Sequence, residues 1–116
     1  MNLTDRCKLT FAVARAIAGE SVIVYTSDQA IARGLLNEAW SLVMDVGDYF
    51  CVNAKYRGSS NANRIKFGNG GEIRFVFRSH IRGMSCDVFV FDECSSVPED
   101  VAPVAMLAKE RFVLDR

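Results

Sequence analysis

Long runs of hydrophobic residues are missing from this sequence. The runs that are present, such as residues 22–25 and 88–91, fall far short of the roughly 20 residues that a membrane-spanning helix needs. A signal peptide is not indicated either, because Asp5, Arg6 and Lys8 precede the first apolar stretch, and no small-residue cleavage site follows it. We therefore expect no membrane segment and a protein that stays in the cytoplasm.

An excess of charge of either sign is missing too. Lys and Arg together number 14, as do Asp and Glu, so the formal net charge is zero. Whole-molecule electrostatics then gives no reason to expect binding to nucleic acid. Any contact with DNA has to come from a local cluster of basic residues.

Paired metal-ligating residues are also missing. Cys7, Cys51, Cys86 and Cys94 form no Cys-x-x-Cys pair, and His80 is the only histidine. The spacing indicates neither a zinc site nor a disulfide framework, and it predicts free, buried thiols. His80 could contact a phosphate or DNA, but a lone histidine without a paired carboxylate is more typical of an ordinary loop residue.

The sequence does contain enough hydrophobic material for one domain. Half of its residues are hydrophobic, so residues 1–116 are treated as a single domain with its own core. Apolar periodicity predicts helices over 6–18, 29–44 and 98–109, and strands over 21–25, 64–67, 72–77, 87–91 and 111–114. Gly19 is expected to end the first helix, and residues 51–63 are expected to form a surface loop. A strand between two helices predicts an α/β fold, with a mostly parallel sheet flanked by helices.

The clearest local pattern is a hairpin. Residues 64–67 and 72–77 alternate polar with apolar side chains, and the glycine-rich residues 68–71 supply the backbone angles of the turn. Alternation places Arg64, Lys66 and Arg74 on the outer face of this hairpin. Together with Arg82 they are the candidate contacts to nucleic acid, although the same charges could merely keep an edge strand soluble.

A hydrophobic strand that ends in acidic residues gives the first indication of chemistry. Residues 88–91 run directly into Asp92 and Glu93, the form of a Walker B element followed by a glutamate. In open α/β sheets, ligands gather at the carboxyl ends of the strands. Asp92 would there hold Mg²⁺, which bridges nucleotide phosphates, and Glu93 would orient and deprotonate the attacking water. Acidic residues at a strand end also occur in loops and helix caps without any such role.

Residues 64–101 resemble the ATPase domain of the phage terminase large subunit in the order and spacing of their elements. The hairpin, a polar connection containing Arg82 and Gly83, and a strand from Asp87 to Asp92 and Glu93 follow one another. The helix, strand and helix that precede them also fit, so the resemblance covers nearly the whole chain. It implies a P-loop NTPase fold of the RecA-like, ASCE type, truncated and with an inserted β-hairpin.

The same resemblance implies an activity and partners. It implies binding of ATP and Mg²⁺ by an ATPase whose hydrolysis drives DNA translocation in bacteriophage DNA packaging. Glu93 would be the catalytic residue and Asp92 the metal ligand. Double-stranded DNA, a portal or other terminase components, and further copies of the chain in a ring would be the partners. A viral protein of this kind would act in the host cytoplasm.

The phosphate-binding loop departs from the family pattern GxxxxGK[ST]. Lys8 takes the lysine position and is expected to open the first helix, with Arg6 and Thr10 as neighbouring candidates for contact with ATP. Cys7 replaces the second glycine, and Leu9 replaces the Ser or Thr that ligates Mg²⁺. A β-carbon at position 7 should strain such a loop by about 1 kcal/mol.

The family's strand before this loop, its coupling motif after the last strand and its nuclease domain have no counterpart in these residues. DNA cleavage is therefore not expected. The first hypothesis is an ATP-binding motor domain, and the second is a catalytically inactive relative that binds a protein or nucleic acid. A helicase-type ATPase fragment is a third, disfavoured because no second RecA-like lobe is recognisable.

Overall fold

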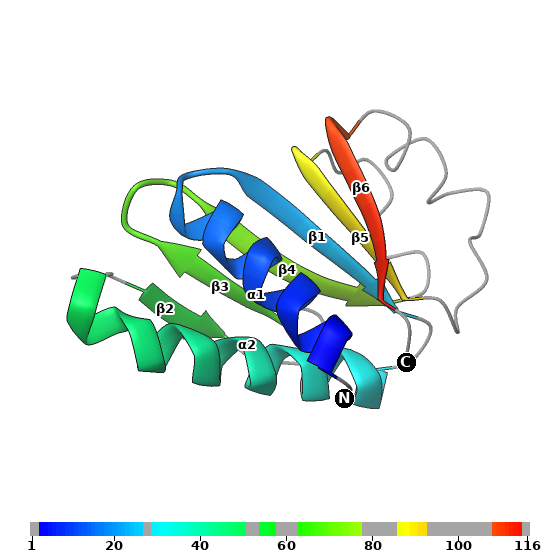
Figure 1. The fold of residues 1–116 in the computed structure, drawn as a ribbon, viewed down its shortest axis with the longest axis horizontal. Helices are drawn as coiled ribbons and strands as arrows, with labels where there is room; N and C mark the ends of the chain where they lie inside the picture. Colours follow the sequence, from blue (N-terminus) through cyan, green and yellow to red (C-terminus); the bar gives the residue numbers. More distant parts are fainter. Residues whose placement is uncertain are drawn as a thin grey trace.

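The structure, a computed structural model, describes residues 3–26, 29–50, 54–57, 63–77, 86–92 and 108–114. A six-stranded sheet in the order β2-β3-β4-β1-β5-β6 forms its centre (Figure 1). In chain order the elements are α1 (Leu3–Ile17), β1 (Ser21–Thr26), α2 (Gln29–Phe50), β2 (Ala54–Arg57), β3 (Arg64–Phe67), β4 (Glu72–Phe77), β5 (Val88–Asp92) and β6 (Glu110–Leu114). The predicted α/β class is confirmed.

The sheet is mostly parallel, as predicted. β1 pairs in parallel with β4 on one side and with β5 on the other, and β5 pairs in parallel with β6. β3 is antiparallel to β4, and β2 is antiparallel to β3, so the predicted hairpin extends one edge of the sheet. The prediction of a loop over 51–63 is wrong for β2. A strand of four residues is too short to show a clear period, and its pairing with β3 decides its structure.

Both described helices pack on the same face of the sheet (Figure 1). Val22 and Val24 of β1 point into this core because side chains alternate along a strand. Trp40 of α2 is partly buried against the same core. The other buried residues of this face are Leu9, Ala12, Val13, Ala16, Ala32, Leu35, Leu36, Ala39, Val43, Ile65, Phe67, Ile73, Phe75, Phe77, Val88 and Val90.

The helices are longer than predicted. α1 begins at Leu3 rather than residue 6, and α2 continues to Phe50 rather than ending at residue 44. Residues 45–50 contain no proline, so nothing in them forces the helix to stop. No helix in the described ranges is long and apolar enough to cross a membrane.

α1 ends as the sequence predicts. Gly19 has a positive φ of 105°, a conformation that glycine adopts without a steric penalty. Its N–H donates to the carbonyl of Ala16 at 3.0 Å, and the N–H of Glu20 donates to the carbonyl of Arg15 at 3.1 Å. This pair of hydrogen bonds is a Schellman motif, which satisfies the last carbonyls of the helix.

The hairpin turn is packed against that helix end. The Asn69 side chain donates from Nδ2 to the carbonyl of Ile17 at 2.6 Å and accepts at Oδ1 from the N–H of Gly71 at 3.1 Å. A β-carbon added to Gly71 would lie 1.8 Å from the carbonyl oxygen of Ala16. Only glycine at position 71 therefore allows the turn to approach α1 this closely.

The second face of the sheet has its own apolar cluster. Ile23 and Tyr25 of β1, Val76 of β4 and Phe89 of β5 are buried there, together with Ala108.

The predicted helix 98–109 lies outside the described residues except for its last two positions, which are not helical. Of the thiols predicted to be buried, Cys7 is exposed, because it lies on the outer side of α1, and that prediction is wrong for it. Cys86 is partly buried, and the other cysteines lie outside the described residues.

Candidate functional site

The carboxyl ends of β4, β1, β5 and β6 lie at one edge of the sheet, because these strands are all parallel. α1 runs antiparallel to β1, since only residues 18–20 connect them, and its N-terminal end therefore lies at the same edge (Figure 1). α2 also begins there, shortly after β1 ends. This edge is where open α/β sheets usually bind their ligands.

β5 brings Asp92 to this edge. Asp92 is the last residue of β5, a strand enclosed between β1 and β6. One position earlier, the ring of Phe91 stacks on that of Tyr25, with centroids 6.3 Å apart and planes inclined by 10°. Burial raises the pKa of Tyr25, so its hydroxyl stays protonated and the stacked pair forms an uncharged aromatic surface next to the strand ends. Delivery of Asp92 to this edge was predicted correctly; its role as a metal ligand stays a prediction, and Glu93 lies outside the described residues.

The residues expected to form the phosphate loop are helical. Because α1 begins at Leu3, Cys7 and Lys8 lie in its second turn, and the expectation that Lys8 opens the helix is wrong. The expected strain at Cys7 is wrong as well, since a helical backbone accepts a β-carbon freely. Only the first four N–H groups of a helix lack an acceptor within it. Backbone contacts to a phosphate could therefore come only from residues 3–6 of this helix.

The basic and polar candidates on α1 differ in their exposure. Lys8 is partly buried and lies about 7.5 Å along the helix axis from Leu3. Side chains in a helix lean towards its N-terminus, so Lys8 leans towards the carboxyl edge of the sheet. Thr10 is exposed. Arg6 belongs to the first turns of α1, and its side chain lies outside the described part of the structure.

Asp87, part of the motif that suggested the family, lies at the other end of β5. Its carboxylate accepts a hydrogen bond from the N–H of Ser21 at 3.0 Å and lies 3.6 Å from Nζ of Lys109. The bond from Ser21, followed by the charge of Lys109, holds the pKa of Asp87 below its usual range. Asp87 therefore ties the amino ends of β1, β5 and β6 together and takes no part in the edge where Asp92 lies.

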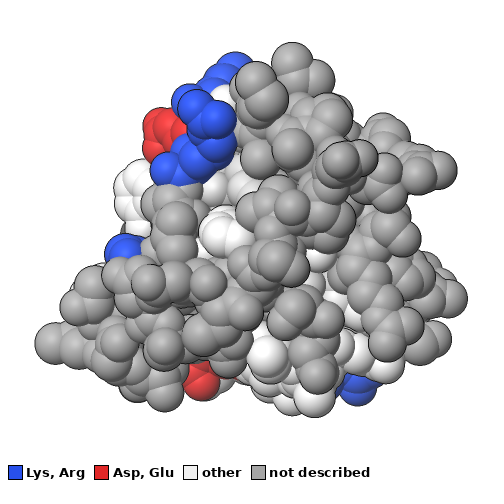
Figure 2. All heavy atoms as spheres, turned by 90° about the vertical axis from the view of Figure 1, so that its right-hand side faces the viewer, with Lys and Arg blue, Asp and Glu red and all other residues white. Residues whose placement is uncertain are grey.

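A second ion-pair group supports the same amino edge. Arg15 of α1 contacts Oε2 of Glu110 and Oε2 of Glu20, each at 2.6 Å. Hydrogen bonds to Glu110 and then to Glu20 raise the pKa of Arg15. On the side of the molecule that is at the right in Figure 1, one group of basic side chains lies next to an acidic one at the upper left, and the other described charged side chains in view are scattered (Figure 2). Among described atoms this side shows no broad surface of one sign.

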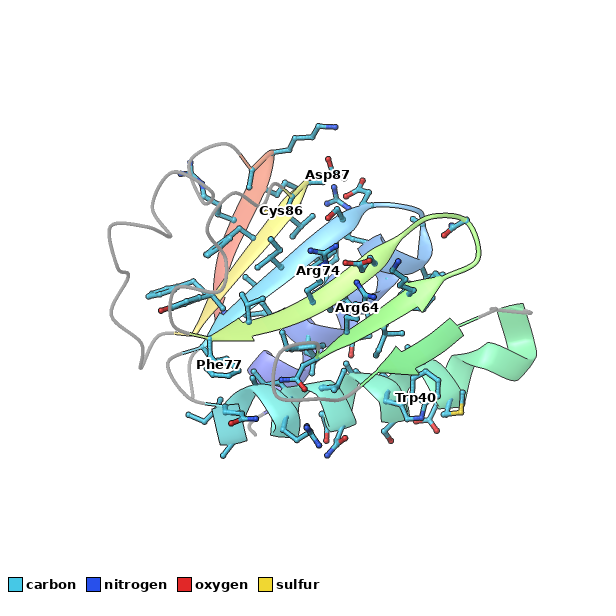
Figure 3. All side chains as sticks on the ribbon, turned by 180° about the vertical axis from the view of Figure 1, so that it is seen from behind. Trp40, Arg64, Arg74, Phe77, Cys86 and Asp87 are labelled. Atoms are coloured by element: carbon cyan, nitrogen blue, oxygen red, sulfur yellow. The ribbon has the colours of Figure 1, made fainter. Side chains whose placement is uncertain are left out.

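The basic residues of the hairpin lie on the face of the sheet opposite α1 and α2. Ile65 and Phe67 point into the helix-covered core, so alternation places Arg64 and Lys66 on the opposite face. Arg74 lies directly opposite Arg64 in the antiparallel register, and Figure 3 shows both side chains together on that face. The predicted placement of these residues is confirmed, whereas their binding role stays a prediction. Arg82 lies outside the described residues, as does His80.

Sequence reasoning missed two contributions to this face. Glu72 sits opposite Lys66 in the ladder, and the backbone register of β2 sets position 55 opposite Lys66 and position 57 opposite Arg64. The signal was the Lys-x-Arg spacing of residues 55–57, which repeats the Arg-x-Lys spacing of residues 64–66.

A comparison with protein-family models, curated proteins and solved structures gave no significant match. No three His, Cys, Asp or Glu side chains converge on a common point within the described ranges.

Proposed function

We propose that this chain is a terminase-like, P-loop-type ATP-binding domain of the viral DNA-packaging class. One observation carries the proposal: Asp92 ends an interior parallel strand at the edge where α1 and α2 both begin. Asp92 would hold Mg²⁺, and the adjacent Glu93 would orient the attacking water. Both roles require these two carboxylates to lie near the nucleotide phosphates. Lys8 leans towards the same edge and would neutralise phosphate charge.

The handedness of the fold is compatible with such a site. β1 and β2 run in the same direction, and α2 connects them as a crossover helix. α2 lies on the same face of the sheet as α1. Nearly all such crossovers are right-handed. Asp92 ends a strand in the interior of the sheet, between β1 and β6.

The partners implied by this function are double-stranded DNA, a portal or other terminase components, and further copies of the chain. ATP hydrolysis would be coupled to DNA translocation in the host cytoplasm. These partners follow from the resemblance of residues 64–101 to the terminase ATPase domain.

A specific observation favours a second candidate. α1 begins at Leu3, so residues 3–8 form helix where a working NTPase has a glycine-rich loop. A domain without that loop would keep the fold but not bind ATP. The second candidate is therefore a catalytically inactive relative that binds a protein or nucleic acid.

Nucleotide binding and turnover separate the two candidates. Titration of the purified chain with Mg·ATP, and with ATP in EDTA, should show Mg²⁺-dependent binding that Asp92→Asn and Lys8→Ala weaken. Glu93→Gln should retain binding but lower turnover roughly 100-fold or more, the usual effect of losing a general base.

Asp87→Asn is the matched control, because it makes the same carboxylate-to-amide change at the opposite end of β5. It should leave nucleotide affinity unchanged. If the wild type neither binds nor hydrolyses ATP, the inactive relative is the better description. If Asp87→Asn and Asp92→Asn weaken binding equally, the assignment of the carboxyl edge is wrong.

A further inference from the structure

The helix-free face of the hairpin carries two cross-strand rows of charge. Arg64 is directly opposite Arg74, and Lys66 is directly opposite Glu72. In the backbone register, β2 sets position 57 opposite Arg64 and position 55 opposite Lys66. We call the four positions with described side chains the hairpin charge rows: Arg64 and Arg74 in one, and Lys66 and Glu72 in the other.

A single carboxylate does not neutralise these rows. Glu72 is largely buried, with its side chain 12 % exposed, and its Oε1 contacts Nε of Arg74. Neither of these two atoms has another hydrogen-bond partner. Nζ of Lys66 is 4.0 Å from the same carboxylate, and the Lys66 side chain is 53 % exposed. Lys66 therefore keeps most of its charge available on the surface, and Arg64 is half-buried.

The row of arginines is not explained by stability of the sheet. Like charges directly opposite each other in an antiparallel ladder destabilise it. Burial and, after it, the charge of Arg64 lower the pKa of Arg74, which reflects this repulsion. Elsewhere in the ladder, Ile65 opposite Ile73 shows the apolar pairing that stabilises a hairpin. An anion placed between the guanidinium groups of Arg64 and Arg74 would attract both and offset their mutual repulsion.

We propose that the hairpin charge rows bind the phosphate backbone of a nucleic acid, with Arg64, Lys66 and Arg74 as the contacts. Arg64 and Lys66 are two residues apart on one strand, about 6.6 Å, and Arg64 and Arg74 are one strand apart, about 4.8 Å. These spacings let neighbouring cations meet successive phosphates. The described side chains of the rows are all charged, so the rows themselves offer no apolar side chain for insertion into a bilayer.

The choice of nucleic acid as the polyanion rests on the proposed DNA-packaging function, but the surface is separate from the edge where Asp92 lies. The test is a fluorescence-anisotropy titration of a fluorescein-labelled DNA duplex of mixed sequence at several KCl concentrations, without nucleotide. Lys66→Gln should weaken binding and reduce the slope of log affinity against log salt by about 0.9, the value for one lost phosphate contact.

Lys109→Gln is the matched control. Lys109 is also an exposed lysine with one carboxylate partner, Asp87, but it lies at the start of β6, across the sheet from β3. It should leave the slope unchanged. An equal effect of Lys66→Gln and Lys109→Gln would overturn the proposal, because only total charge would then matter.

Two further variants separate binding from folding. Arg64→Gln should weaken DNA binding while leaving the melting temperature unchanged or higher, since it removes the repulsion with Arg74. Glu72→Gln should tighten binding, because it removes the only acidic residue of the rows. Parallel loss of stability and affinity in Arg64→Gln would overturn the proposal. So would binding to phosphatidylserine vesicles with no binding to the duplex.

The outcome is independent of the ATP site. DNA binding that follows these variants in a chain without nucleotide binding would leave the hairpin charge rows in place and remove only the proposed ATPase function. If the chain binds Mg·ATP, with or without Lys66→Gln, but does not bind the duplex, the proposed ATP site stands and the proposed role of the hairpin charge rows is refuted.

Discussion

Replacing Gly71 by alanine tests how closely the hairpin turn packs on α1. The added β-carbon would lie 1.8 Å from the carbonyl oxygen of Ala16 and 3.0 Å from Cα of Gly19. Carbon and oxygen atoms that are not bonded rarely approach within about 3 Å. Both neighbours are backbone atoms, so neither can rotate away. The turn must therefore move from α1 by roughly 1 Å or more.

That movement breaks the contacts that join the turn to the helix end. The hydrogen bond from Asn69 to Ile17 is 2.6 Å long, and the one from the N–H of Glu72 to the carbonyl of Glu20 is 3.1 Å. Overpacking costs about 1–3 kcal/mol, and each lost hydrogen bond roughly 1 kcal/mol. We expect Gly71→Ala to lower the free energy of unfolding by about 3 kcal/mol, out of a typical 5–15 kcal/mol. The melting temperature should fall by roughly 10–15 °C.

Urea unfolding followed by far-UV circular dichroism measures this change. Gly34→Ala is the control, because no heavy atom lies within 4 Å of a β-carbon added at this position in α2. It should raise the free energy of unfolding by up to about 1 kcal/mol, since alanine has the higher helix propensity. If Gly71→Ala has the same unfolding midpoint as the wild type, the close packing of the turn on α1 is wrong.

Three further results are expected. Asp87→Asn should reduce stability at pH 7 and reduce it progressively less as the pH falls below about 4: the hydrogen bond from Ser21 depresses the pKa of Asp87, so its contribution is fully present above the ordinary pKa and is lost as the pH falls through the depressed value. A pH series of urea midpoints that keeps the two proteins equally far apart would contradict this. Iodoacetamide at pH 8 should modify the exposed Cys7 well before Cys86, whose pKa burial raises to about 11, and mass spectrometry would show the reverse order if the burial were wrong. Asn69→Ala should lower the free energy of unfolding by about 1–2 kcal/mol, because it removes both hydrogen bonds of this side chain; an unchanged urea midpoint would show that they contribute nothing.

The local elements were predictable because their signals are short-range. The alternation of residues 64–67 and 72–77 gave the hairpin, Gly19 gave the end of α1, and the run into Asp92 gave the end of β5. Each depends on the periodicity or backbone freedom of a few neighbouring residues. The α/β class followed from the order of these elements.

The limits of the helices and the phosphate loop were less predictable. The pattern GxxxxGK[ST] assigned a loop to residues 2–8, but no glycine or proline in residues 3–8 interrupts the helix, and α1 starts at Leu3. The prediction of a phosphate-binding loop depended on a family pattern that the sequence matches only at Lys8. Helix propensity and packing of Leu9 against the sheet decided the structure instead.

The sequence by itself determined which side chains are charged, which strands have an apolar face and where glycine allows a turn. Only the tertiary structure decided which of them meet. Pairing of β3 with β4 set Arg64 opposite Arg74, and the parallel pairing of β1 with β5 put Asp92 at the edge where β1 ends and α2 begins. These relations join residues far apart in the chain, and strand order and register, which fix them, leave no signal in a single stretch of sequence.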